Sequence, residues 1–132
     1  MSTISARRWG IATLALIGLL APGCSSVNVR SQPYLGVPRY PPSDPARVEI
    51  LAREPARPKD RLAEIILDIE GSPSRDTIEG KIKAAVAELG GDAAFIVFDQ
   101  THLFPVVYAD AYGTTVSQEA RRGIVAVAIK YK

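Results

Sequence analysis

The chain has 132 residues, with 16 Lys or Arg, 14 Asp or Glu and a single Cys. Arg7 and Arg8 lie in the first 23 residues, which contain no acid, so the 109 residues left after those 23 carry 14 charges of each sign. This balance excludes the basic surface of a nucleic-acid-binding protein, and one cysteine excludes an intramolecular disulfide. A chain of this length forms one small domain.

The N-terminus has the pattern of a secretory signal. Arg7 and Arg8 precede an apolar run over residues 11–21, which is too short to span a bilayer because a spanning helix needs ~20 residues. Small residues then lead to Cys24, an order that resembles a bacterial lipoprotein signal, although Leu20 lies one position early for that motif. The resemblance implies lipid attachment at Cys24, and Ser25 implies an outer-membrane address. Ordinary cleavage, giving a secreted protein with a free Cys24, is the alternative.

The sequence predicts three segments: a signal peptide over residues 1–23, a lipidated tether over 24–46 and a folded domain over 47–132. Prolines at positions 33, 38, 41, 42 and 45 favour an extended spacer of about 70 Å. An ordered arm that packs on the domain through Tyr34 and Tyr40 is the other interpretation.

In the first half of the domain, alternating apolar residues predict strands over 48–51 and 62–70. A helix follows, with Asp76 and Glu79 as a capping pair and Gly90 as its stop. Its apolar residues recur at helical spacing and predict one buried side: Ile78, Ile82, Ala85, Val86 and Leu89.

The second half predicts a central strand over 93–98, a loop over 99–102, a strand over 106–112, a polar loop over 113–122 and a last strand over 124–131. The expected fold class is therefore α+β, with one amphipathic helix packed on a small sheet of four to five strands. One shared core is expected to hold Ile65, Leu67, Ile82, Leu89, Ile96 and Val127.

The turn Leu89-Gly90-Gly91-Asp92-Ala93, between helix and buried strand, and the flanking strands resemble the YbjQ-like and Rcs-sensor-like group of small bacterial α+β domains. Many members of that group are lipoproteins, and the resemblance covers residues 47–131. The Rcs sensor carries disulfides that this chain cannot form, so the resemblance implies a general type and no specific signalling role.

Candidate chemistry is sparse. His102 is the single histidine, and a hydrolase would have to use it with Ser117 and with Asp99 or Asp110. A metal site could combine His102 with Asp99, but zinc requires more nitrogen or sulfur ligands. We therefore expect no catalytic residue, no metal and no cofactor. The Gly90-Gly91 turn ends a helix, so it is not expected to bind phosphate.

Tyr108 and Tyr112 are the residues expected to contact a partner if they are exposed, since tyrosine is enriched at interfaces. The expected protein is a lipid-anchored, periplasm-facing outer-membrane protein that acts as a non-enzymatic protein-interaction or signalling module. Its partners would be the membrane, through the lipid, and another envelope protein or a second copy, but not nucleic acid. The alternatives are a periplasmic module that binds a small ligand or metal between helix and sheet and, third, a hydrolase that uses His102.

Overall fold

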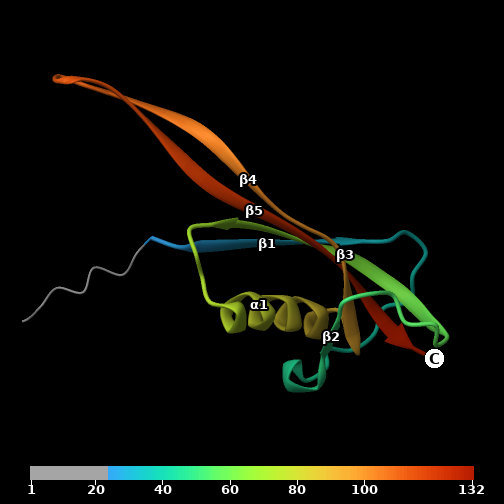
Figure 1. The fold of residues 1–132 in the computed structure, drawn as a ribbon. Coiled ribbons are helices and arrows are strands. Elements are labelled where there is room, and N and C mark those ends of the chain that lie inside the picture. Colours follow the sequence, from blue (N-terminus) through green and yellow to red (C-terminus); the bar gives the residue numbers. More distant parts are fainter. Residues whose placement is uncertain (1–23) are drawn as a thin grey trace, which may run out of the picture.

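The computed structural model describes residues 24–132, so the expected signal peptide lies outside the described residues. Five strands form one sheet in the order β1-β3-β5-β4-β2 (Figure 1). The elements are β1 (Ser26–Pro33), a short 3-10 helix (Pro45–Arg47), β2 (Glu49–Leu51), β3 (Lys59–Glu70), α1 (Arg75–Glu88), β4 (Ala93–Asp110) and β5 (Gly113–Tyr131).

The sheet is mixed. β2 runs parallel to β4, whereas the β1–β3, β3–β5 and β4–β5 pairs are antiparallel. One α-helix and five strands in the described part of the chain confirm the α+β class with a small sheet. No helix there is long and apolar enough to cross a membrane.

The structure corrects the tether expected over residues 24–46. Ser26–Pro33 form β1, an edge strand that pairs with β3 from Ser26↔Glu70 to Pro33↔Ala63. The following residues are attached as well, because the Tyr40 hydroxyl donates to Asp60 at 2.9 Å and the Ser43 amide donates to the carbonyl of Ala87 at 2.8 Å. An edge strand needs backbone partners on one side only. Val27 and Val29 alternate with polar residues and pack against the core, which is sufficient for an edge strand. The prolines that follow them led to the prediction of a spacer.

The N-cap of α1 lies two residues before the expected one. The hydroxyl of Ser74, and not Asp76, accepts a hydrogen bond from the Thr77 amide at 3.2 Å, as an N-cap residue does. Gly90 ends the helix with φ +74°, as its sequence position predicts. Ile78, Ile82, Ala85, Val86 and Ala87 are buried, and Leu89 is partly buried.

The core lies on both sides of the sheet. The main cluster packs α1 against Ile65, Leu67 and other residues of β3, β4 and β5. A smaller cluster on the other side contains Ala93, Phe95, Val127 and Ile129. The expectation that Val127 shares the main core is wrong, because Val127 pairs with Glu64 and not with Ile65, and neighbouring residues in a strand point to opposite faces.

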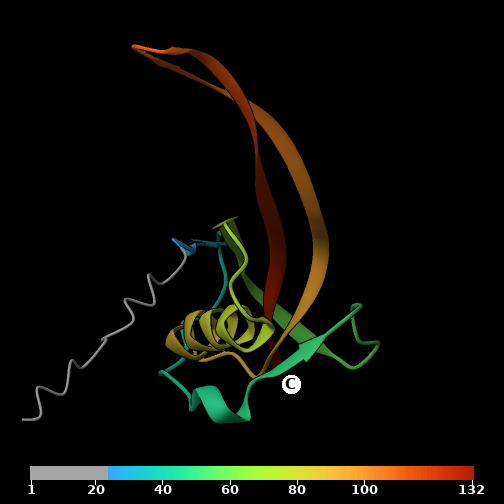
Figure 2. The same ribbon diagram turned by 60° about the vertical axis from the view of Figure 1, so that its left-hand side comes forward.

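β4 and β5 are much longer than their neighbours. They pair continuously from Ala93↔Ile129 to Asp110↔Gly113, so the loops expected over 99–102 and 113–122 are strand, and 93–98 and 106–112 belong to one element. β3 ends where Glu70 pairs with Arg121. Beyond this point the two strands project from the domain as a bare hairpin (Figure 2).

Candidate contact site at the Cys24 end of the sheet

Cys24 is exposed and lies against the turn between β3 and α1. Its carbonyl oxygen is 2.9 Å from the point that a β-carbon on Gly71 would occupy, and Ser25 approaches the same point within 3.1 Å. Gly71 has φ +77°, a conformation that glycine adopts readily. The expected lipid-attachment residue is therefore seated directly on the domain and not at the end of a spacer.

The hairpin leaves the sheet at this same end. Ser26 pairs with Glu70, Glu70 pairs with Arg121, and Arg121 pairs with His102, so the first residues of β1 lie in line with the base of the projecting hairpin. The nine residues from Leu103 to Ala111 extend roughly 25–30 Å beyond that line. In Figure 1 the chain also enters β1 at the end of the sheet from which the hairpin projects.

The projecting hairpin exposes large apolar side chains. They are Leu103 (64%), Phe104 (48%), Val107 (60%), Tyr108 (51%), Tyr112 (100%) and Val116 (63%). Side chains of this size are seldom exposed together on a protein that works alone, so the hairpin has the character of a contact surface.

The two strands of the hairpin differ in composition. Residues 103–109 of β4, which we call the apolar row, contain no charged side chain and no polar one except the Tyr108 hydroxyl. The opposing residues 114–120 of β5, called here the β5 row, contain two Thr, Ser, Gln and Glu. Leu103 and Val107 point to the α1 side of the ribbon, and Phe104 and Tyr108 to the other side, because faces alternate along a strand. The polarity of the hairpin thus changes from strand to strand and not from face to face.

Tyr108 and Tyr112 lie in different elements. Tyr108 lies on β4, where its hydroxyl donates to Glu119 at 2.7 Å, and this hydrogen bond raises the pKa of the phenol. Tyr112 lies in the turn between β4 and β5, where its amide donates to the Asp110 carboxylate at 2.8 Å. Both rings are exposed, which is the arrangement under which the sequence predicts a partner contact.

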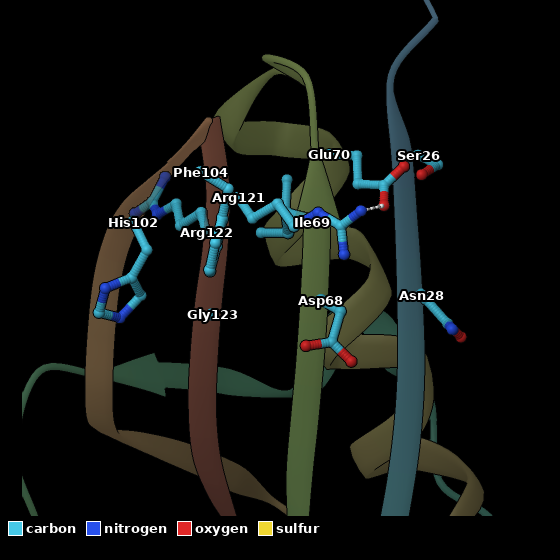
Figure 3. Close-up of a pocket in the computed structure, with 10 residues that line it drawn as sticks. All are labelled: Ser26, Asn28, Asp68, Ile69, Glu70, His102, Phe104, Arg121, Arg122 and Gly123. Carbon is cyan, nitrogen blue, oxygen red and sulfur yellow. Dashed lines mark ion pairs between the residues drawn. The ribbon is translucent and has the colours of Figure 1, made fainter. Parts of the chain in front are cut away.

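The charged residues at the base of the hairpin are paired. Arg122 donates to both carboxylate oxygens of Asp99, at 2.6 and 2.5 Å, and this contact holds the pKa of Asp99 below its usual range. Arg121 forms an ion pair with Glu70 (Figure 3), with 3.4 Å between the charged atoms, and Arg30 lies 3.5 Å from Asp68. The base therefore presents balanced charge and no basic patch.

A hollow of about 530 Å³ lies beside these pairs, on the face of the sheet away from α1. Figure 3 shows that Asp68 and Glu70 stand on one side of it and His102 on the other, with Gly123 between them. Gly123 leaves the floor open because it has no side chain. The surrounding groups are exposed and mutually paired, so the hollow offers a ligand few unused partners.

The residues proposed for hydrolysis are not assembled. His102 is on β4 and not in a loop, and Ser117 pairs with Val106, roughly 13 Å further along the ribbon. Asp99 points to the opposite face and is held by Arg122. Asp110 lies eight residues from His102 along the strand. Within residues 24–132, no group of three His, Cys, Asp or Glu side chains is placed to hold a metal ion.

A groove of about 430 Å³ does lie between helix and sheet. Ile78 and Ile82 of α1, Ile50 of β2 and Ile124 of β5 line it. Its charged members, including Asp99 and Arg122, are already paired. This groove is the place where the small-ligand alternative would apply.

Sequence reasoning missed three exposed members of the apolar row: Leu103, Phe104 and Val107. A continuous apolar segment such as 103–109 predicts a strand that is covered on both faces. The segment Thr-Thr-Val at 114–116 is rich in β-branched residues, which favour a strand. This signal could have identified the strand that pairs with residues 103–109.

Known proteins add little. No family model matches the chain, and no curated protein matches it. Among solved structures, the crystal structure of a Francisella virulence factor, FvfA, is similar, with 12% identity over 76% of this chain and 97% of that chain and a TM-score of 0.40. A likeness of this size supports no argument about function.

Proposed function

We propose that the protein is a lipid-anchored, periplasm-facing protein of the outer membrane, and that its domain is a non-enzymatic interaction module. The lipid would be attached to Cys24 after removal of residues 1–23. The resemblance to the YbjQ-like and Rcs-sensor-like group is part of this proposal, as is the amphipathic character of α1, whose Ile78, Ile82 and Val86 are buried while Lys81 is exposed.

One observation carries the proposal: the β4–β5 hairpin exposes its apolar side chains where no described part of the chain covers them. Exposed apolar surface costs free energy in water, and its burial against another envelope component recovers roughly 25 cal/mol per Å². Tyr108 and Tyr112 contribute the aromatic contacts, and a signal would pass through the same surface.

The anchor is tested by the intact mass of the mature protein, which should show acyl chains on Cys24. Cys24→Ala should release the domain from membranes into the soluble fraction. A correctly cleaved protein with an unmodified Cys24 contradicts the anchor.

The contact is tested by a photo-crosslinking amino acid at Tyr108 or Tyr112 in intact cells. Both positions should give adducts with a protein or a lipid of the envelope. Ala84, exposed on α1, is the matched control and should give none above background. Equal yields at Ala84 and on the hairpin would mean that the hairpin is not the contact element.

The small-ligand alternative rests on the groove beside Ile82 and Ile124. Narrowing it with Ile50→Phe, at a partly buried edge position, should leave the hairpin crosslinks unchanged if the proposal is correct. Loss of those crosslinks would favour the ligand-binding module instead.

A further inference from the structure

We propose that the apolar row of β4 lies on the surface of the bilayer that carries the Cys24 lipid, so that the protein holds its membrane at two points. This inference rests on the proposed function, because it takes Cys24 as the anchor. It adds the chemistry of the surface that the hairpin contacts, which is the interfacial region of a lipid bilayer.

The first argument is the distance between anchor and hairpin. Only Ser25 separates Cys24 from β1, so about 7 Å of chain joins the anchor to the line that ends at His102. Cys24 is also seated against Gly71, within 2.9 Å of its missing β-carbon. The base of the hairpin is therefore held close to the membrane, and the hairpin, roughly 25–30 Å long, projects from the sheet at that same end.

The second argument is how the apolar side chains are distributed. A flat protein partner would bury one face of the ribbon, yet Leu103 and Val107 lie on one face and Phe104 and Tyr108 on the other. A ribbon that rests on its β4 edge places all four in the interface and leaves the β5 row towards water. This is the strand counterpart of an amphipathic helix that lies in the plane of the membrane.

The backbone limits how deep the hairpin can go. β4 has no neighbour on its outer side after Phe95, and β5 has none on its outer side before Arg121. Free backbone donors and acceptors are not tolerated in the hydrocarbon region, so the hairpin lies at the level of the headgroups. Pro105 interrupts the free edge of β4, which disfavours the addition of a strand from a second copy.

The third argument is the charge at the base. Arg121 is paired with Glu70, Arg122 with Asp99 and Arg30 with Asp68. No surplus of cations is left to attract acidic lipids. Binding should therefore depend on apolar contact and not on salt.

The orientation is tested with the mature chain, residues 24–132, carrying Cys24→Ser so that no lipid is attached. Trp9 is the single tryptophan of the sequence and lies in the removed segment, so one introduced tryptophan reports alone. In the Tyr108→Trp variant, the fluorescence emission of the tryptophan should shift to shorter wavelength when neutral phosphatidylcholine vesicles are added. Brominated lipid in the vesicles should quench this fluorescence. Thr115→Trp, directly opposite on β5, and Ala84→Trp on α1 should change little. Equal quenching at Tyr108→Trp and Thr115→Trp would overturn the proposed orientation.

The contact is tested by a second matched pair. Val107 and Val116 oppose each other and are equally exposed, at 60% and 63%, so glutamate at either position should leave the fold intact, which circular dichroism checks. Val107→Glu should lower the affinity for vesicles, measured by flotation, roughly tenfold. This is the factor expected when a valine contact is replaced by a charge. Val116→Glu should change the same affinity by less than about twofold. Flotation that requires acidic lipid or vanishes in 1 M salt would contradict the proposal.

The outcomes separate this inference from the proposed function. Vesicle binding that is absent in the wild-type chain, together with specific protein adducts at Tyr108 in cells, rejects the bilayer as the contact and leaves the interaction module standing. An unmodified Cys24 rejects the anchor, and with it the two-point attachment, whatever the vesicles show.

Discussion

The side chain of Tyr40 occupies the space beside Gly90, where its Cβ lies 2.6 Å from the point that a β-carbon on Gly90 would take. Tyr40 belongs to the N-terminal arm, and Gly90 ends α1. The arm and the helix are therefore fitted to each other at a residue that has φ +74° and no side chain.

Gly90→Ala should lower the free energy of unfolding by roughly 1–3 kcal/mol, because it adds a β-carbon both to a left-handed backbone and to an occupied space. Urea denaturation measures the loss. Gly80→Ala is the control: no atom lies within 4 Å of its β-carbon position in α1, so the change should raise stability by up to about 1 kcal/mol. Equal effects at the two glycines would mean that the arm does not pack at Gly90.

Starting the chain at Arg47 should destabilise the domain strongly, since it removes β1 and the Tyr40–Asp60 hydrogen bond. The loss should be a large share of the ~5–15 kcal/mol that a domain commonly has. Thermal unfolding, followed by circular dichroism, measures it. A chain that starts at Ser26 keeps β1 and serves as the control. An unchanged melting temperature for the shorter chain would restore the spacer interpretation of residues 24–46.

The elements predicted best were those with a clear period. β3, α1 and the stop at Gly90 follow from alternating or helical apolar spacing, which reports local geometry directly. The prediction of a spacer over residues 24–46 is wrong because proline content reports the stiffness of the chain. The formation of β1 depends instead on a free edge of β3, which only the tertiary structure reveals.

The predictions of loops over 99–102 and 113–122 are wrong for a related reason. Polar residues such as Ser117 and Gln118 indicate a loop when strands are expected to be covered, but a projecting ribbon is exposed on both faces. Pairing along residues 113–122 satisfies the backbone without a core. Of the contact site, only Tyr108, Tyr112 and the position of Cys24 could be proposed from the sequence.

Ile65→Ala should cost roughly 2–5 kcal/mol in urea denaturation, because Ile65 is completely buried under α1. Glu64→Ala, on the opposite face, removes one hydrogen bond that the Tyr34 hydroxyl donates at 3.2 Å and should cost about 1 kcal/mol. A greater loss at Glu64 than at Ile65 would mean that the register of β3 is shifted by one residue.

The Asp99–Arg122 pair should add a pH dependence to stability. Arg122 lowers the pKa of Asp99 in the folded state, so the contribution of Asp99 is complete above its unfolded pKa of about 3.9 and is lost as the pH falls through the lower folded value. Urea midpoints from pH 7 down to pH 2 measure this loss. The Asp99→Asn variant should be slightly less stable than the wild type at pH 7. Its free energy of unfolding should also fall less when the pH is lowered. Parallel curves for the two proteins would mean that the pair contributes nothing.

Tyr112→Ala should leave the free energy of unfolding within about 0.5 kcal/mol of the wild-type value, because the ring is fully exposed. The same change should weaken the hairpin's contact in the cell, seen as fewer adducts from a crosslinker at Tyr108. Normal crosslinking together with normal stability would remove Tyr112 from the contact surface.

We expect the pairing of the strands to set an order of folding. β4 and β5 adjoin through a two-residue turn, so their hairpin can close within microseconds, and β3 then adds to the free side of β5. β1 bonds only to β3 and has to wait for it, although β1 is made first. The N-terminal end of the described chain is thus the last part to be fixed. If Cys24 carries the proposed lipid, the anchor residue is the last to be placed against Gly71.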